Sequence, residues 1–213
     1  MQHKQGVYEK YIKRLIDIIC SIVVFVLFWW LYIILAVLVR MKLGTPILFR
    51  QQRSGQNGRI FNMYKFRTMT DKRDKSGNLL SDEERLTKFG KELRATSLDE
   101  LPEIFNILKG DMSLIGPRPL LPKDVACMNS IQDMRHCVRP GLTGLAQCSG
   151  RNLLDWDVKL SKDVEYVSNL SFGLDVRIAM KTIYKVFKHE GVEYDAGTEM
   201  DLKDWNELKK EEQ

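Results

Sequence analysis

The sequence predicts an α+β protein: a small mixed helical domain with a β-hairpin, anchored by an N-terminal re-entrant membrane helix and interfacial helices. Three observations carry this prediction. The chain of 213 residues contains one long stretch without formal charge, two extended runs around a turn signal, and several capped apolar patterns at helical spacing. We divide it into a membrane-inserted segment (1–43), a central domain (44–191) and a charged C-terminal tail (192–213).

The composition limits the class of protein before any motif is considered. Hydrophobic residues make up 44% and charged residues 29%, which excludes both a disordered chain and a protein with many membrane spans. The four cysteines lack the CxxC or Cys/His spacing of a zinc site or a disulfide framework. They therefore indicate a reducing compartment.

The basic charge is concentrated in the N-terminal third of the chain. Residues 1–70 contain eleven Lys/Arg and two acids, and the stretch from Arg40 to Thr70 contains seven basic residues and no acid. Such a block favours an anionic partner, which can be lipid headgroups, phosphates or nucleic acid.

Residues 18–39 form an apolar segment of 22 positions without a formal charge. A helix of this length rises roughly 33 Å, which is enough to cross a bilayer core. The run is too long for the apolar part of a signal peptide, and no small-residue cleavage site follows it. A buried helix of a soluble protein is the other interpretation, but a helix that is apolar on every side disfavours it.

The topology of this segment is predicted from its flanks and its middle. Basic residues stand on both sides of it: Lys10, Lys13, Arg14, Arg40 and Lys42. Positive charge at both ends favours keeping both ends in the cytoplasm, and Trp29 and Trp30 would lie at mid-bilayer in a spanning helix. We therefore expect a re-entrant hairpin or bent helix with irregular backbone near residues 28–31, whereas an uninterrupted spanning helix is the cheaper local conformation.

After the apolar segment the sequence predicts a β-hairpin and then a helix. PILFRQQR (46–53) and RIFNMYKFRTM (59–69) are rich in β-formers, and a Gly-Gln-Asn-Gly turn signal separates them. Ser81 and Glu84 form a capping-box pattern. The apolar stripe that continues this helix has helical spacing and consists of Leu86, Phe89 and Leu93.

Further helices and two loops complete the predicted domain. Ser97 and Glu100 repeat the capping pattern before a helix that runs to about Leu108 and is closed by Gly110. The charged tail from Met200 is expected to be solvated. The remaining elements are loops rich in Gly and Pro at 110–119 and 139–152, and helices at about 156–169 and 173–189.

Two adjacent acids at a helix start are the first candidates for chemistry. Asp99 and Glu100 point about 100° apart on a helix, so one carboxylate can attack phosphorus or hold a metal while the other manages a proton. The same acids suit a purely structural role, because acids in the first helical turn favour the dipole and Glu100 completes a cap. The local sequence leaves both roles open.

Several basic positions suggest phosphate recognition. Arg118 lies between two prolines, so its guanidinium projects from a stiff loop. Lys65 and Arg67 alternate along a strand onto one face. Arg151-Asn152 follows a glycine in a second loop. Each residue also fits a plainer role, as a turn residue or as part of a solvated strand edge.

Along nearly its whole length the chain resembles the minimal monotopic phosphoglycosyl transferases, which are bacterial sugar transferases. The apolar segment is followed, in the family's order and spacing, by FRQQRSGQNGRIFNMYKFRTM (49–69), SLDELPEIFNILKGDMSLIGPRPL (97–120), RPGLTGLAQCSGRN (139–152) and DVEYVSNLSFGLD (163–175). One position departs from the family: Trp29-Trp30 stands where members usually carry Ser-Pro, whose proline breaks the helix.

The resemblance implies a reaction and its residues. A sugar 1-phosphate passes from a UDP-sugar to polyprenol phosphate through a covalent phosphosugar-Asp intermediate, giving polyprenol-diphosphate-sugar and UMP, the first membrane step of glycoconjugate synthesis. It maps the catalytic dyad onto Asp99 and Glu100, with Mg²⁺ as cofactor held by Asp99. The residues expected to bind substrate are Lys65, Arg67, Arg94, Arg118, Arg151, Asn152 and Asp175.

The resemblance also implies a location. The protein is expected at the inner (cytoplasmic) membrane, in contact with membrane lipids, with the catalytic domain 44–191 facing the cytoplasm and with no nucleic acid partner. The alternative is a membrane-anchored protein without enzymatic activity whose basic face binds anionic lipid or nucleic acid. Such a module needs no paired acids and no rigid arginine downstream of its basic block. The sequence does not separate a simple hexose donor from an N-acetylated or more modified sugar.

Overall fold

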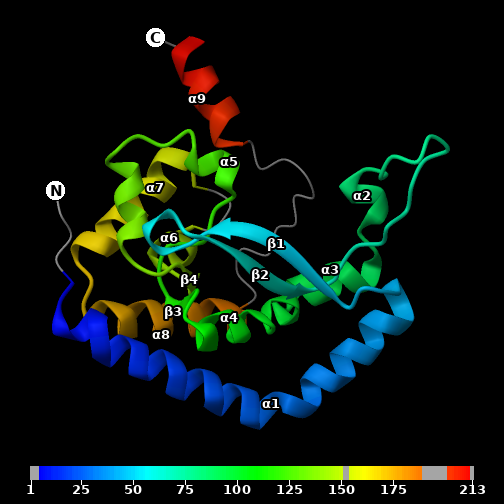
Figure 1. Ribbon diagram of the computed structural model, residues 1–213, viewed down its shortest axis with the longest axis horizontal. Coiled ribbons are helices and arrows are strands. Elements are labelled where there is room, and N and C mark those ends of the chain that lie inside the picture. Colours follow the sequence, from blue (N-terminus) through cyan, green and yellow to red (C-terminus); the bar gives the residue numbers. More distant parts are fainter. Residues whose placement is uncertain (1–4, 151–153, 189–200, 212–213) are drawn as a thin grey trace.

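The computed structural model describes residues 5–150, 154–188 and 201–211. Its N-terminal part is one long helix, in which a π-helical turn, η1 (Tyr8–Ile12), leads into α1 (Lys13–Leu43). Because α1 is helical throughout, the expectation of irregular backbone near residues 28–31 was wrong. The helix is nevertheless bent, with both ends turned toward the rest of the molecule and the apex pointing away from it (Figure 1).

The bend in α1 occurs without a proline. In the middle of the helix, the indole nitrogen of Trp30 donates a hydrogen bond to the carbonyl of Leu27 at 3.0 Å. Carbonyls on the outer side of a bent helix tilt away from their helical donors, and in apolar surroundings no water replaces the weakened bond. This side-chain donor belongs to the Trp29-Trp30 pair, at the position where the family resemblance leads us to expect Ser-Pro.

Both ends of α1 pack against the protein, whereas its middle is largely exposed; at the N-terminal end, Lys13, Asp17 and Ser21 are buried. By length and composition, residues 8–43 form a helix able to cross a membrane, and only 11% of its most apolar window is buried. The C-terminal part is different, because Leu35, Val39 and Leu43 pack with Phe66 and Leu93 in one apolar cluster. The exposed apolar middle indicates a membrane-associated helix, since exposing so much apolar surface to water is unfavourable in free energy.

The predicted hairpin is confirmed. Strands β1 (Leu48–Ser54) and β2 (Ile60–Phe66) pair antiparallel, from Leu48 opposite Phe66 to Ser54 opposite Ile60. The connection contains a short turn, η2 (Gln56–Gly58), in which Asn57 adopts a left-handed conformation. Asparagine tolerates this conformation better than most residues, which explains its place in the turn.

The helix predicted after Ser81 is two helices. The capping box of Ser81 and Glu84 is present, but α2 (Asp82–Arg85) ends after one turn. A second helix, α3 (Lys88–Ala95), begins with Thr87 as its cap. The single helix was wrong because Leu86 is extended and forms a β-bridge with Met69, the last residue of the hairpin motif.

The second predicted capping box is absent. Ser97 is left-handed and makes no side-chain cap; residues Leu98–Glu100 form the 3₁₀ turn η3, and α4 (Glu103–Lys109) starts only after Pro102. Leu101 and Pro102 keep helical dihedral angles, but proline has no N–H to donate, so the helical hydrogen bonding is interrupted between η3 and α4. Gly110 ends α4 in a left-handed conformation, as expected.

Both predicted loops contain a short strand. Strands β3 (Ser113–Ile115) and β4 (Gly141–Thr143) pair in parallel, with Ser113 opposite Gly141. A Cβ atom on Gly141 would lie 2.1 Å from the backbone nitrogen of Gly116, so only glycine permits this approach. The Gly and Pro residues that signalled loops therefore bring two backbone segments into contact.

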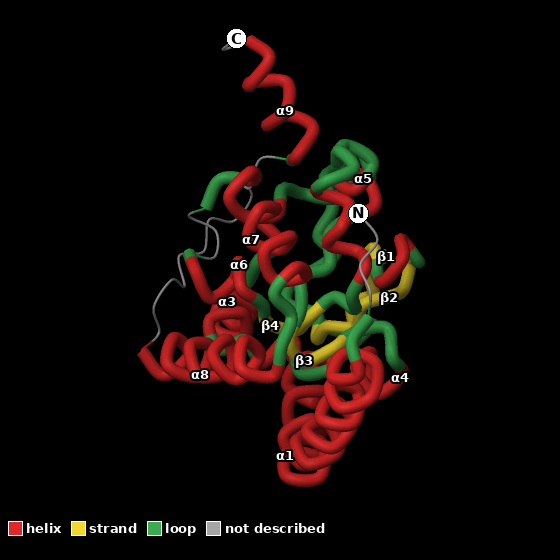
Figure 2. The backbone as a smooth tube through the Cα atoms, turned by 90° about the vertical axis from the view of Figure 1, so that its left-hand side faces the viewer, coloured by secondary structure: helices red, strands yellow, loops and turns green. Residues whose placement is uncertain are grey.

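The C-terminal third is helical. The expected helices are confirmed as α7 (Trp156–Ser168) and α8 (Phe172–Lys188). The described part of the charged tail is a largely exposed helix, α9 (Leu202–Glu211), but its first residue, Leu202, is fully buried and packs with Trp156 and Leu160, which the sequence did not indicate. Figures 1 and 2 place α9 at the end of the molecule opposite α1, while the first turn of α8 contacts the N-terminal part of the long helix. The shorter elements are α5 (Pro122–Val125), η4 (Gln132–Cys137) and α6 (Leu145–Ser149).

Candidate active site

The hairpin and the start of α4 bring one lysine between two acids. Lys65, on β2, places its ammonium 2.6 Å from Glu100 Oε1 and 3.2 Å from Glu103 Oε1. Arg118, on the loop after β3, lies 3.9 Å from the same oxygen of Glu100. The structure therefore brings residues from two separate sequence motifs, 49–69 and 97–120, into one charged cluster.

Asp99 lies in the same cluster but is more deeply buried than Glu100. Burial is the main cause that raises the pKa of Asp99 to about 6, and the neighbouring Glu100 raises it further. The positive charges of Lys65 and Arg94 oppose this rise. A carboxylate with a pKa near 6 is ionised at neutral pH yet more basic than an ordinary aspartate, which suits a nucleophile.

Glu103 is the residue that the sequence interpretation missed. Its side chain is almost completely buried, and burial, together with the charge of Glu100, raises its pKa despite the nearby Lys65. A position four residues after Asp99 falls on the same side of a helix, and that spacing was the available signal. Pro102 obscured it, because the helix begins only at Glu103.

The loop that carries Arg118 is held rigidly by buried groups. The carbonyl of Arg118 accepts a hydrogen bond from Arg135 at 2.6 Å, and Arg135 forms an ion pair with Asp163 at 2.7 Å. Arg53 donates to the carbonyl of Pro119 at 3.2 Å. Because the backbone is fixed from both sides, the half-exposed guanidinium of Arg118 projects from a stiff support.

A small surface pocket opens beside this cluster. It brings the hairpin together with α4, the loop of Arg118 and β4, so that basic and acidic groups face one opening. The residues that line it are Arg53, Met63, Lys65, Glu103, Arg118, Pro119, Gly141 and Leu142. Two arginines and a lysine around one opening are suited to the oxygens of a phosphate group.

Two other residues that were predicted to bind substrate, Arg94 and Arg67, do not line this pocket. Arg94 donates to the hydroxyl of Thr68 at 3.0 Å, and its charge acts on Asp99. Arg67 is buried and binds the carbonyls of Thr45 and Met69. Arg67 thus ties the exit of the hairpin to the end of α1. Arg151 and Asn152 lie outside the residues that the structure describes.

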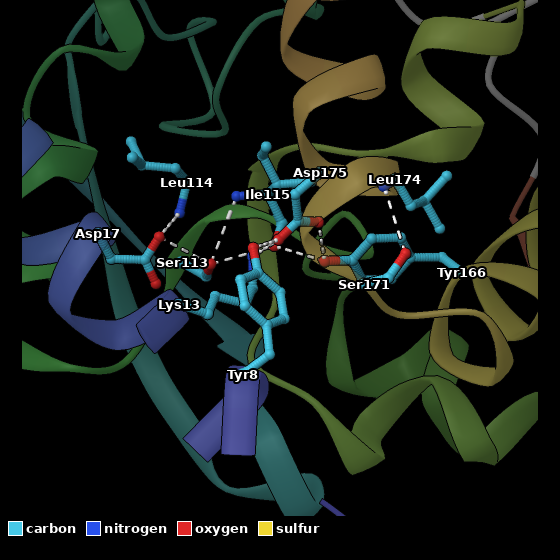
Figure 3. A network of polar contacts seen from close by, with 10 residues as sticks. All are labelled: Tyr8, Lys13, Asp17, Ser113, Leu114, Ile115, Tyr166, Ser171, Leu174 and Asp175. Atoms are coloured by element: carbon cyan, nitrogen blue, oxygen red, sulfur yellow. Dashed lines mark hydrogen bonds and ion pairs between the residues drawn. The ribbon is translucent and has the colours of Figure 1, made fainter. Parts of the chain in front are cut away.

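Asp175 belongs to a different network (Figure 3). Its carboxylate accepts hydrogen bonds from Tyr8, Lys13 and Tyr166, each at 2.7 Å, and it is buried at the start of α8. Nearby, Asp17 accepts bonds from Ser113 and the backbone of Leu114. No described contact joins Asp175 to the cluster around Lys65, so the structure does not bring these two sets of predicted site residues together.

Asp99 is the residue expected to hold Mg²⁺, so the carboxylates around it must suit this ion. Among the described residues there is no group of three or more His, Cys, Asp or Glu that fits a metal ion. Mg²⁺ keeps several waters and often uses only one or two carboxylates together with substrate phosphates. Asp99 is a single buried carboxylate whose charge interacts with Lys65, a residue of the basic pocket, and this arrangement fits the second mode of binding.

Comparison with known proteins identifies the class of enzyme. The bacterial sugar transferase family matches residues 8–189, and the chain belongs to that family. It is 47% identical, over 85% of its length and 90% of the relative's, to the uncharacterized sugar transferase EpsL of Bacillus subtilis. The non-enzymatic alternative is therefore set aside.

Two further relatives have names that state a reaction. The undecaprenyl-phosphate galactose phosphotransferase of Salmonella typhimurium is 36% identical over 86% of this chain, and the UDP-glucose:undecaprenyl-phosphate glucose-1-phosphate transferase of Klebsiella pneumoniae is 40% identical over 82%. The chain spans only 42% and 40% of these two longer proteins.

Proposed function

We propose that this protein transfers a sugar 1-phosphate from a UDP-sugar to polyprenol phosphate and releases UMP. The observation that carries the proposal is the cluster of Asp99, Glu100, Lys65 and Arg118, which combines a nucleophile of raised pKa with phosphate-binding cations. The reactions named for the Salmonella and Klebsiella relatives support the same donor and acceptor classes. The apolar α1 supports a substrate that resides in the membrane.

In the first half-reaction, a carboxylate oxygen of Asp99 attacks the phosphorus that carries the sugar. The bond from this phosphorus to the bridging oxygen breaks, and UMP leaves with the electron pair, so that a phosphosugar-Asp intermediate remains. Lys65 and Arg118 are placed to neutralise the phosphate oxygens, because both line the pocket. Mg²⁺, held by Asp99, supplies further neutralisation of the diphosphate when it is bound.

In the second half-reaction, a phosphate oxygen of the polyprenol phosphate attacks the same phosphorus. The bond to Asp99 breaks, which regenerates its carboxylate and releases the polyprenol-diphosphate-sugar. Glu100 is the more exposed member of the dyad, so its carboxylate is accessible to the incoming phosphate in this step. Any proton on the attacking phosphate passes to Glu100.

The membrane supplies the acceptor, and two helices support a monotopic attachment. The bent α1 has both ends on the side of the catalytic domain (Figure 1), which suits entry and exit through one leaflet. Helix α8, whose first turn is bonded to Lys13 at the start of α1, carries an exposed apolar stripe flanked by Arg177 and Lys181, as interfacial helices do. The stripe consists of Phe172, Val176, Met180, Ile183 and Tyr184. The positive-inside rule then puts the domain in the cytoplasm.

The order of the reaction tests the catalytic proposal. Purified protein with Mg²⁺, a UDP-sugar and polyprenol phosphate is expected to show ping-pong kinetics, and labelled sugar phosphate is expected to remain on the protein when the acceptor is omitted. Asp99→Asn should abolish both the labelling and turnover while the protein stays folded. A ternary-complex pattern, or substantial turnover by Asp99→Asn, would refute the covalent mechanism.

A panel of UDP-sugars in the same UMP-release assay identifies the donor.

The topology of α1 is tested separately, with a cysteine placed at Gln2. An impermeant reagent should modify this cysteine in inverted vesicles and not in intact cells. Modification in intact cells would establish a spanning helix instead.

A further inference from the structure

We infer that three aromatic rings between α1 and α4 bind the first isoprene units of the acceptor's polyprenyl chain; this inference rests on the proposed function. The aromatic triad consists of Phe25 and Tyr32 of α1 and Phe105 of α4. Every pair of its rings is in contact, with centroids 5.7 Å apart for Phe25 and Tyr32, 5.6 Å for Phe25 and Phe105, and 6.0 Å for Tyr32 and Phe105.

The triad is attached directly to the backbone that carries the dyad. The hydroxyl of Tyr32 donates to the carbonyl of Leu101 at 2.9 Å, and Leu101 immediately follows Glu100. On the same stretch, Glu103 and Phe105 are two helical positions apart and so point about 200° apart. Glu103 lines the polar pocket, whereas Phe105 packs on the rings of α1. The start of α4 thus separates a phosphate-binding side from an apolar side.

A polyprenol phosphate has the same division at its own head. Its phosphate must reach Asp99, while the adjacent isoprene units must remain in apolar surroundings. The triad offers such surroundings on the side of α4 opposite the pocket, and it is not fully covered by protein, since Phe25 is 37% and Phe105 41% exposed. These ring surfaces are open to a ligand that arrives along the membrane helix.

Aromatic rings also suit this ligand better than an ordinary acyl chain. An isoprene unit is flat around its double bond and carries a branching methyl group, so it makes closer contact with a ring face than a flexible saturated chain does. The neighbouring exposed positions of α1 are aliphatic at Val23, Val26 and Leu27, which is sufficient for contact with bulk lipid. Phe28, Trp29 and Trp30 are exposed on α1 as well, but the ring contacts between α1 and α4 are made by Phe25 and Tyr32.

Kinetics with matched variants test the site. Phe25→Leu and Phe105→Leu keep an apolar side chain but remove the ring; Phe28→Leu, at an equally exposed phenylalanine of α1 outside the triad, is the control. We expect each triad variant to raise KM for polyprenol phosphate about tenfold and to reduce its advantage over an unbranched alkyl phosphate of equal length. KM for the UDP-sugar and the acceptor-free burst of UMP should be unchanged, and this burst also reports correct folding.

Photo-crosslinking gives a second readout that does not depend on turnover. A prenyl phosphate with a diazirine in its first isoprene unit should label the peptides of Phe25, Tyr32 and Phe105 in preference to that of Phe28. Unaltered acceptor KM in both triad variants, an equal change in Phe28→Leu, or labelling spread evenly along α1 would overturn the inference. Failure of the wild-type protein to release UMP from any UDP-sugar would instead refute the proposed function.

Discussion

Lys13 and Lys65 are both largely buried lysines that join sequence-distant parts of the chain, yet they sit in networks of opposite character. Lys13 meets a single carboxylate, Asp175, which also accepts hydrogen bonds from Tyr8 and Tyr166 at the same 2.7 Å (Figure 3). The charge of Lys13 also acts on the nearby Asp17, which is bonded to Ser113 and Leu114. This closed network fixes the start of the membrane helix to α8.

The network around Lys65 is open by comparison. Lys65 is shared between Glu100 and Glu103, and the half-exposed Arg118 approaches Glu100 only to 3.9 Å. Burial and the negative charge of Glu100 raise the pKa values of Asp99 and Glu103, so keeping these two acids ionised costs free energy. The difference teaches that a buried ion pair with short, matched bonds indicates anchoring, whereas shared and strained charges beside a pocket indicate chemistry.

Replacing Lys65 should have the largest effect on activity. Lys65→Met removes a cation from the reacting phosphates, so we expect kcat to fall at least about 100-fold, as with other losses of electrostatic stabilisation. The free energy of unfolding should change little, because Glu103 can take up a proton once Lys65 is gone. UMP release and thermal unfolding in detergent measure the two effects. A variant that unfolds readily but turns over normally when folded would contradict the comparison.

Replacing Lys13 should have the opposite profile. Lys13→Met leaves Asp175 buried without its cation, so we expect a loss of about 3–5 kcal/mol in the free energy of unfolding. The UDP-sugar KM of the remaining folded protein should be unchanged. Lys42→Met, at an exposed lysine near the other end of α1, is the matched control and should leave thermal unfolding unaltered. Equal stability of the two variants would show that the closed network does not anchor α1.

Arg118→Lys sharpens the contrast within the open network. The lysine keeps the charge but loses the planar fork that holds two phosphate oxygens, so we expect a decrease of about 10- to 100-fold in kcat/KM. Stability should be unaffected, because Arg135 and Arg53 bind backbone carbonyls of this loop and not the side chain of Arg118. Steady-state rates near those of the wild type would reduce Arg118 to a turn residue.

The smallest effect is expected in the middle of α1. Trp30→Phe keeps a ring but removes the indole donor to the Leu27 carbonyl, which should lower stability by about 1 kcal/mol. Trp29→Phe is the matched control, since the indole of Trp29 makes no hydrogen bond within the residues that the structure describes. Thermal unfolding in bilayer discs compares the two variants. A larger loss in Trp29→Phe would assign the bend to packing of the rings.

The sequence predicted the elements whose signals are local. The hairpin and helices α7 and α8 follow from turn residues and apolar periodicity, which act over a few neighbours. It failed where a distant contact decides the outcome, as at Leu86, whose bridge to Met69 interrupts a helix, and at β3 and β4, which pair across about 25 residues of chain. The burial of Leu202 was also missed, because its sequence neighbours are charged and it is buried only by contact with Trp156 and Leu160 of α7.

The candidate site shows the same division. Asp99 and Arg118 stood out through their immediate neighbours, but the partners that define their chemistry come from other segments of the chain. Glu103 became part of the site only when β2 brought Lys65 to it. Asp175 was grouped with the site by family resemblance, whereas its observed partners are Tyr8, Lys13 and Tyr166. Resemblance identifies important residues more readily than it identifies what each one touches.

The bend of α1 has a mechanical consequence for the surrounding bilayer. A helix that enters and leaves through one face displaces lipid tails in that monolayer alone, so inserting it expands one monolayer relative to the other. The bound protein therefore stores lateral tension, and its affinity for a membrane should depend on packing defects and on curvature. In the one-leaflet attachment proposed above, the protein acts as a wedge, so strongly curved membranes should bind it more tightly.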